Sequence, residues 1–409
     1  MSNNLVTIDM VTREALRIAH EKCQFISTTD RQYDSSFAKT GAKIGASLRV
    51  RKPNQYLRTQ GTRVMDVQEQ DEQTSTVTVA TQDHVDMRFN SAELALSLDE
   101  LSKRYIEPAV SSLVSAIEGD YLAYATKKTY NVVGTAGTAI TDLTAPGLAR
   151  ARLNQMLAPK DRNRAIQMDS VTMAGLVKGV AAYFNPSGAI SEQYREGLVA
   201  RTSMADYYEN ERVWTLTNSG DVTVTTAAAA AVTDGGTNIT LASVGAGDTT
   251  AGMTFTVAGV YACHPETKQS LGYLQPYVVI TGGATTQTVS PATILTGPRQ
   301  NVCSAASAQL ATTAYNGTAV AVTFFGAANT SYAQSLMYHK EAFQFVTADL
   351  PLMDDAHKCV RRSQDGLSLR VWQASDIRND ELLMRIDILY GMAALRPEWA
   401  CRMIGAASA

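Results

Sequence analysis

Apolar residues near the start of the chain recur at helical spacing. Within residues 9–26 the apolar positions are Val11, Ala15, Ile18, Ala19 and Cys23. Charged residues occupy the opposite face of the same stretch. The pattern predicts an amphipathic helical arm.

Two segments further on alternate between apolar and polar residues with a period of two. They are residues 46–51 (Ala-Ser-Leu-Arg-Val-Arg) and 75–81 (Ser-Thr-Val-Thr-Val-Ala-Thr). This alternation is typical of half-buried strands, so the two segments predict a long antiparallel hairpin.

Charge is segregated along this hairpin. The outgoing side carries Arg49, Arg51, Lys52, Arg58 and Arg63, and the returning side carries Asp66, Glu69, Asp71 and Glu72. One interpretation is a solvated ribbon. The other is that so long a ribbon has too little core of its own and lies on another subunit, which makes these nine residues candidates for inter-subunit contacts.

A long helix is predicted next. Ser97-Leu98-Asp99-Glu100 matches a capping box and marks the start of a helix, which Pro108 interrupts or kinks. Apolar positions at helical spacing continue to Lys128; they are Val110, Leu113, Val114, Ile117, Tyr121 and Tyr124. Together they predict a spine of about thirty residues, on the order of 45 Å long.

Strand and helix patterns alternate from about Thr129 onward. Thr144-Ala145-Pro146 is a helix start, residues 165–168 form a buried strand pattern, and Asp169 or Ser170 caps a helix that runs to Val180. Alternating apolar strands return near the end of the chain, at residues 342–350, 367–372 and 382–389. These patterns predict an α/β unit and a set of closing strands.

Residues 222–335 interrupt this pattern with a block rich in Thr, Ala, Gly and Val. The only charged residues of the block are Asp234, Asp248, Glu266, Lys268 and Arg299. Strand patterns occur at residues 254–257, 277–281 and 319–325. The block therefore predicts an inserted β domain, a small barrel or sandwich.

Composition narrows the class of protein. The chain has 409 residues, of which 45% are hydrophobic, and this length and composition suit two or three globular domains. The net charge of -3 argues against a protein whose main function is to bind nucleic acid. Five scattered cysteines indicate reduced thiols. Residues 1–10 lack a secretory signal pattern, and the uncharged stretches are too broken to span a membrane, so we expect a soluble intracellular protein.

Candidate chemistry is sparse. Cys263-His264 and His357-Lys358-Cys359 are the nearest approach to metal pairs, and no second pair stands at ligand spacing. No phosphate loop or nucleophile elbow occurs. We therefore expect no catalytic residue, cofactor or metal. Two functions stay open as alternatives. One is an enzyme, with Asp169, His339 and Asp354 as its carboxylate–imidazole set. The other is a different self-assembling structural protein, such as a phage tail tube or surface-layer subunit.

Several stretches resemble a known family. They are residues 89–94 (Phe-Asn-Ser-Ala-Glu-Leu), 101–110, 386–391 (Ile-Asp-Ile-Leu-Tyr-Gly) and 396–398 (Arg-Pro-Glu), with similar turns at 158–162 and 195–197. With the order of arm, hairpin, spine, interrupted α/β unit and returning strands, the chain resembles the major capsid protein of tailed bacteriophages. In particular, it resembles the podovirus Salmonella-phage coat type, which carries an inserted domain.

The resemblance implies an α+β fold, the Hong Kong phage-type capsid fold, with a defined domain order. The expected parts are an N-terminal arm (1–40), an extended hairpin loop and the start of a peripheral domain (41–90), the spine helix (91–128), the first part of an axial domain (129–221), the inserted β-rich domain (222–335), the second part of the axial domain (336–365) and C-terminal strands of the peripheral and axial domains (366–409).

The resemblance also implies a function. Such a protein assembles with itself, as hexamers and pentamers, into an icosahedral shell that encloses double-stranded DNA. The implied partners are a scaffolding protein, a portal and packaged DNA as a non-specific neighbour, with no membrane. The implied location is the virion capsid, assembled in the cytoplasm of the host bacterium.

Overall fold

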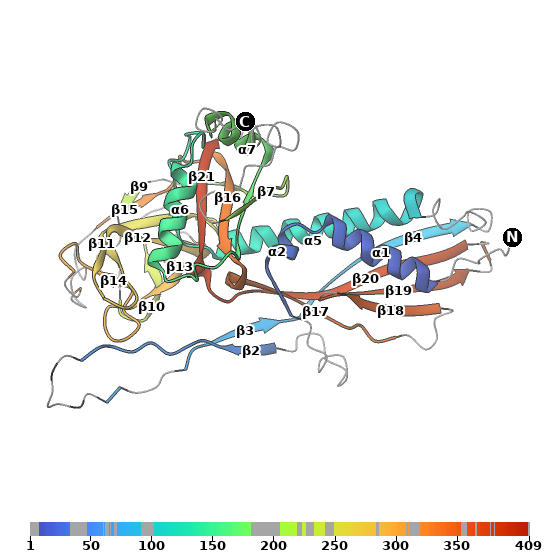
Figure 1. Cartoon of the computed structure of the whole chain (residues 1–409), viewed down its shortest axis with the longest axis horizontal. Helices are drawn as coiled ribbons and strands as arrows, with labels where there is room; N and C mark the ends of the chain where they lie inside the picture. The colour runs from blue at the N-terminus through green and yellow to red at the C-terminus, as the bar shows by residue number, and fades with distance from the viewer. Residues whose placement is uncertain are drawn as a thin grey trace. The chain divides into compact units, whose positions relative to one another are not determined.

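The computed structural model describes most of the chain (Figure 1). The described residues are 8–32, 47–59, 61, 65, 67–68, 72–90, 102–180, 205–218, 223–225, 233–241, 249–283, 286–307, 310, 320–352, 358–364, 366–376, 378–379 and 381–407. The chain divides into two compact units. Unit 1 comprises Met1–Val50, Thr74–Leu122 and Phe343–Leu395, and unit 2 comprises Arg51–Gln73, Ala123–Ala342 and Arg396–Ala409.

A six-stranded sheet forms the centre of unit 1. Its path is β1 (Asp30–Gln32), β17 (Phe343–Ala348), β20 (Glu381–Ala394), β19 (Leu367–Asp376) and β18 (Lys358–Gln364), and β4 (Thr81–Asn90) pairs with β20. All pairs are antiparallel except β1 with β17. The alternating segments near the end of the chain predicted β17, β19 and β20, and the structure confirms them.

Helices cover this sheet. The arm predicted at residues 9–26 is confirmed as α1 (Ile8–Lys22), which packs on β18 and β19, followed by the short helix α2 (Phe25–Thr28). The spine is α5 (Glu107–Lys128), preceded by the π-helix η2 (Ser102–Ile106). Pro108 lies in the first turn of α5, directly after the π-helix, so the regular α-helical pattern is broken where Pro108 was expected to interrupt or kink the helix. The predicted capping box at residues 97–100 lies outside the described residues.

The predicted hairpin is confirmed at its root. Strands β2 (Ser47–Arg51) and β3 (Thr74–Thr78) form a two-stranded sheet, and Lys52 donates its backbone N–H to the carbonyl of Gln73 directly beyond it. We call the segment between the two strands, residues 52–73, the ribbon. Val77 and Val79 at the root belong to a buried cluster with Val346 and Leu389.

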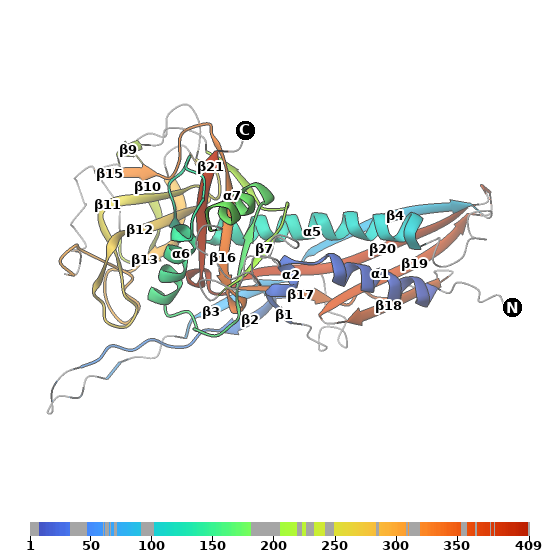
Figure 2. The same cartoon turned by 45° about the horizontal axis from the view of Figure 1, so that its top comes forward.

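A second six-stranded sheet lies in unit 2. Its path is β5 (Val132–Val133), β21 (Ala400–Ala407), β16 (Ser331–His339), β6 (Arg164–Met168) and β7 (Asp206–Glu209), and β8 (Thr215–Thr217) pairs with β16. Short 3-10 turns η3 (Lys340–Ala342) and η4 (Pro397–Trp399) follow β16 and precede β21. Helix α6 (Thr144–Gln155) packs on β21, β16 and β5 (Figure 2).

The local signals for helix starts in this unit are confirmed. Asp169 Oδ2 accepts a hydrogen bond of 3.1 Å from the N–H of Thr172, which caps α7 (Ser170–Val180). Asp142 Oδ1 accepts one of 2.9 Å from the N–H of Thr144, where α6 begins. Helix and strand thus mix in both units, which confirms the α+β class.

The uncharged block forms a β sheet with its own core. Its strands are β9 (Thr223–Thr225), β10 (Gly236–Thr240), β11 (Thr254–Cys263), β12 (Ser270–Thr281), β13 (Thr286–Thr293), β14 (Val302–Cys303) and β15 (Ala321–Phe324), in the order β10-β13-β12-β11-β15-β9 with β14 on β11. Phe255, Tyr277 and Phe324 lie at the centre of its core. The boundary expected at Ser335 falls inside β16, a single strand that begins at Ser331.

Candidate assembly surfaces

The ribbon and its root carry the charged residues singled out from the sequence. Arg49 and Arg58 are exposed, Lys52 is half-buried, and Arg51 forms an exposed ion pair of 3.3 Å with Glu72 across the base of the ribbon. The structure therefore brings together one basic and one acidic candidate within the same chain. Four other candidates, Arg63, Asp66, Glu69 and Asp71, lie outside the described residues.

A side chain holds the two sides of the ribbon together farther out. Gln68 accepts a hydrogen bond of 2.8 Å from the N–H of Leu57 through Oε1 and donates one of 2.6 Å to the carbonyl of Leu57 through Nε2. The side-chain amide of Gln68 thereby makes the two hydrogen bonds that the backbone of a paired strand would make with Leu57. Met65 and Val67 are 87% and 78% exposed. Both apolar side chains therefore remain largely in contact with water in the single chain.

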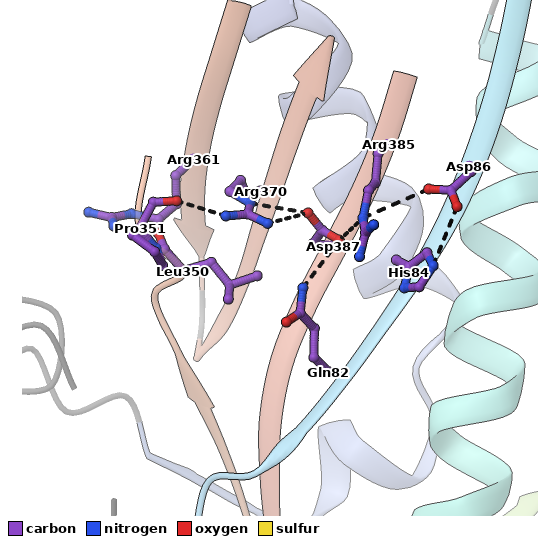
Figure 3. A network of polar contacts seen from close by, with 9 residues as sticks. All are labelled: Gln82, His84, Asp86, Leu350, Pro351, Arg361, Arg370, Arg385 and Asp387. Atoms are coloured by element: carbon purple, nitrogen blue, oxygen red, sulfur yellow. Dashed lines mark hydrogen bonds and ion pairs between the residues drawn. The ribbon is translucent and has the colours of Figure 1, made fainter. Parts of the chain in front are cut away.

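A buried carboxylate links three strands of the unit 1 sheet (Figure 3). Asp387 on β20 is fully buried and accepts hydrogen bonds from Arg370 on β19, at 2.6 and 3.1 Å, and from Arg385 on its own strand. Gln82 on β4 is a weaker partner at 3.5 Å. Two guanidinium groups on one carboxylate offset its desolvation, so the group is stable only as a set.

Arg370 and a further arginine, Arg361, hold the chain in place as it leaves β17. Arg370 donates a 2.8 Å hydrogen bond to the carbonyl of Pro351, and Arg361 donates one of 2.9 Å to the carbonyl of Leu350 (Figure 3). Asp349, nearly buried, pairs with Arg361 at 3.3 Å. These contacts hold the chain at Leu350 and Pro351 against the sheet.

A second buried carboxylate fastens the N-terminal arm to the spine. Glu118 on α5 has no exposed surface, and its Oε1 accepts hydrogen bonds from the N–H groups of Gln24, Phe25 and Ile26 at the start of α2. Negative charge at the start of a helix is favourable. At the surface Asp9 pairs with Arg362 on β18 at 2.7 Å, and this hydrogen bond lowers the pKa of Asp9.

A buried arginine joins three segments of unit 2. Arg402 on β21 donates hydrogen bonds of 2.8 Å to the carbonyl of Thr129, just after α5, and of 2.6 Å to the carbonyl of Gly252 in the insert. Burial lowers the pKa of its guanidinium to about 9. The partial negative charge of the carbonyl groups at the C-terminus of α5 stabilises this buried guanidinium, in the place of a carboxylate partner.

The contact at Gly252 leaves no room for a larger residue. The backbone there has φ +99, and a Cβ would come within 3.0 Å of Cζ3 of Trp214. Lys127 at the end of α5 lies over the same Trp214 ring, 5.1 Å from its centre. The insert is thus seated directly on the end of the spine within unit 2.

Burial in the insert has a consequence at alkaline pH. Burial raises the pKa of the Cys263 thiol to about 12 from an ordinary value of 9.0. Above pH 9 the unfolded state therefore binds fewer protons than the folded state, so stability falls as pH rises. We expect Cys263→Ala to remove about 1.4 kcal/mol of that loss between about pH 8 and pH 10. Urea unfolding at the two pH values measures it; equal losses in both proteins would contradict it.

The residues of the alternative enzyme set serve structural contacts where they are described. His339 Nε2 lies 2.9 Å from Oδ1 of Asp161, its Nδ1 accepts the N–H of Glu341 at 3.3 Å, and its ring meets that of Trp399 edge-on. Asp169 caps α7. Asp354 lies outside the described residues, and within the described ranges no three His, Cys, Asp or Glu side chains gather as a metal site requires.

Two further findings concern membrane-spanning helices and disulfides. Of the helices in the described parts of the chain, none combines the length and apolar character needed to cross a bilayer. None of the five cysteines, all of which lie in the described parts of the chain, forms a disulfide.

Solved phage structures are similar to the chain at low sequence identity. One described as Mycobacterium phage Che8 is 9% identical, with 93% of this chain and 90% of that chain covered and a TM-score of 0.48. The capsid of Ralstonia phage GP4 is 9% identical, with 93% and 86% covered and a TM-score of 0.45. The capsid of cyanophage P-SCSP1u is 11% identical, with 93% and 87% covered and a TM-score of 0.44. No curated protein matches the chain.

A family model gives the stronger relationship. The model described as "P22 coat protein - gene protein 5" matches residues 72–405, which include the spine helix, the insert and both six-stranded sheets except β1 and the last two residues of β21. Because the match runs through most of the chain, the protein belongs to the P22 coat protein family and is a major capsid protein, a subunit that assembles into the shell of a tailed bacteriophage.

Proposed function

We propose that this subunit forms a closed icosahedral shell of hexamers and pentamers around packaged double-stranded DNA, and that it does so without catalysing a reaction. The family match over residues 72–405 is the observation that carries the proposal. A scaffolding protein and a portal are the proposed partners during assembly in the host cytoplasm. The net charge of -3 suits a wall that does not hold DNA tightly.

The domain roles follow the same proposal. Unit 1, with the spine and the arm, corresponds to a peripheral domain, and the sheet of β5, β21, β16, β6 and β7 to an axial domain that carries the insert. The arm α1–α2 faces the interior of the shell. This assignment agrees with the packing of the arm on one side of the unit 1 sheet.

The ribbon is the proposed inter-subunit contact. In this proposal its basic residues meet acidic residues of a neighbouring copy, and the pair Arg51–Glu72 of the single chain exchanges partners on assembly. Among the described residues neither Arg49 nor Arg58 has a carboxylate partner. Each exposed pair contributes only about 0–1 kcal/mol, so a stable shell requires many such contacts per subunit.

Charge reversal tests the role of the ribbon. We expect Arg49→Glu, Arg51→Glu and Lys52→Glu together to leave a folded subunit that forms no particles, because like charges then meet at the contact. Negative-stain electron microscopy and sedimentation velocity measure particle formation, and circular dichroism measures folding.

Three exposed basic residues elsewhere provide the matched control. Lys160, Arg162 and Lys340 lie on turns of unit 2, and their reversal to Glu changes net charge equally. We expect this control to assemble. Normal particles from the ribbon variant would refute the contact. Tubes or sheets from the unaltered chain would refute the closed shell, and a small monodisperse species in all conditions would refute self-assembly.

A further inference from the structure

Two cysteines of the insert lie on neighbouring strands. Cys263 is the last residue of β11 and Cys303 the last residue of β14, and the two strands pair with Tyr261 opposite Cys303. The N–H of Cys263 donates a 2.9 Å hydrogen bond to the carbonyl of Asn301, so the pairing continues to the end of β11. Alternate residues of a strand share a face, which places Cys263 diagonally across from Cys303 on the same face of the sheet.

The two thiol groups contact each other. They share a side-chain hydrogen bond. The Cys303 thiol also donates to the carbonyl of Ala262, the residue before Cys263, at 3.9 Å. Two sulfur atoms held this close on one face of a sheet are placed to form a bond with each other.

A disulfide between these cysteines requires only a small movement. Diagonal residues of an antiparallel pair have Cα atoms about 7–8 Å apart, whereas a disulfide joins Cα atoms about 4.4–6.8 Å apart. One strand must therefore shift by about 1 Å. Strand β14 has two residues and, among the described strands, pairs with β11 alone, so it can shift without breaking a second set of strand contacts.

Both thiols are shielded from solvent in the folded insert but lie beside exposed turns. Cys263 is 2% exposed and Cys303 is 0% exposed. Residues 266–267 and 305–307, which follow them, are exposed. Opening of the short strand β14 breaks few contacts, so it exposes both sulfur atoms to a small reagent without unfolding the insert.

Polar groups around the sulfur atoms favour the thiolate that disulfide exchange requires. Burial raises the pKa of both thiols, and nearby groups act in the opposite direction. The ammonium of Lys268, held by two backbone carbonyls at 2.5 and 3.3 Å, places its positive charge near Cys263. Hydrogen bonds from Cys263 and Ser270 favour the thiolate of Cys303. Because two donors act on Cys303, we expect it to react first.

We propose that Cys263 and Cys303 are a modification site, at which a low-molecular-weight disulfide oxidises the two thiols to a protein disulfide that joins β14 to β11. The thiolate of Cys303 attacks one sulfur of the small disulfide, forms a mixed disulfide and releases one small thiol. The thiolate of Cys263 then attacks Sγ of Cys303 and releases the second small thiol. The two protein thiols lose two protons and two electrons, which the small disulfide takes up as it becomes two thiols.

The surroundings of the subunit decide the state of this pair. A cytoplasm keeps thiols reduced, whereas conditions outside a cell are oxidising. The bond therefore forms after assembly, in the released particle; this timing, but not the bond itself, rests on the proposed function. The bond closes a loop of about forty residues within the insert, which stabilises the folded state mainly by restricting the unfolded chain.

Oxidised glutathione is the probe that tests the bond. The purified full chain is incubated with it, remaining thiols are alkylated without reduction, and the peptides are mapped by mass spectrometry. We expect peptides joined through Cys263 and Cys303, and an unfolding temperature that rises by about 5 °C or more and falls back when a reducing agent is added. A stable mixed disulfide at either cysteine, or alkylation of both, would overturn the inference.

Two alanine variants separate this pair from the other thiols. Cys303→Ala removes one partner, so we expect no joined peptides and no gain in unfolding temperature over its own reduced form. Cys359→Ala removes a half-buried thiol of β18 in unit 1 and should gain as much as the unaltered chain. The opposite pattern would show that another thiol causes the effect. Every measurement uses the free subunit, so absence of particles would refute the proposed shell without affecting this test.

Discussion

Glu118→Ala will lower the free energy of unfolding of the free subunit by about 3 kcal/mol or more, the largest loss we expect from a single helix residue. The change removes the acceptor of three backbone N–H groups at the start of α2 and leaves those of the buried residues Phe25 and Ile26 without it. A hydrogen bond to a charged group contributes about 1.5–3 kcal/mol, and an orphaned buried donor adds its own cost. Urea unfolding measures the loss, and hydrogen exchange at residues 24–26 localises it.

Two substitutions make this result specific. Glu118→Gln keeps one acceptor oxygen without the charge, so we expect it to recover part of the stability. Glu107→Ala removes an exposed carboxylate from the same helix, 3.9 Å from Lys22, and should change stability by less than about 0.5 kcal/mol. Equal effects of Glu118→Ala and Glu107→Ala would show that Glu118 does not hold the arm.

Asp387→Ala is expected to cost about 3–5 kcal/mol, because it leaves the buried Arg370 and the half-buried Arg385 without their shared carboxylate. The loss should extend to the turn at Leu350 and Pro351, since Arg370 holds one of its carbonyls. Chemical denaturation measures the total, and hydrogen exchange in β18 and β19 reports the loosened sheet.

Asp86→Ala is the control for this network. Asp86 pairs with Arg385 at 3.8 Å but is largely exposed, so its removal should cost no more than about 1 kcal/mol. Similar losses from both alanine variants would mean that burial does not govern the strength of the Asp387 contacts.

Much of the fold was predictable from local pattern. Period-two alternation indicated β17, β19 and β20, and Asp169 and Thr144 marked the starts of two helices. The likeness of a few short stretches to phage coat proteins was enough to predict the family and the fold class correctly. Each of these signals lies within a dozen residues, which is the range over which spacing alone is informative.

The end of the insert was harder to predict for a physical reason. The nearly uncharged block continues into β16 because that strand is buried between β21 and β6, and strands buried between two neighbours are mostly apolar whichever sheet they join. The π-helix before α5 was also not predicted, because its residue types do not differ from those of an ordinary α-helix. Sequence pattern shows that a segment is buried, not which partner buries it.

The supporting residues were missed because their partners are distant in sequence. Arg402 meets Thr129 and Gly252, and Glu118 meets the start of α2. One signal was available: a lone charge inside an apolar run, as in Ile386-Asp387-Ile388, indicates a buried ion pair. This signal identifies the buried charged residue but not the residue with which it pairs.

The contact between the insert and the end of α5 limits which other domains could replace the insert. Gly252 allows no Cβ beside Trp214, and its carbonyl is one of two acceptors for Arg402. A foreign domain grafted in place of the insert would have to present a bare backbone carbonyl at that point, or Arg402 would have to be changed with it. Fusions to the insert therefore belong in exposed loops remote from residues 249–253, where neither the carbonyl of Gly252 nor its contact with Arg402 is disturbed.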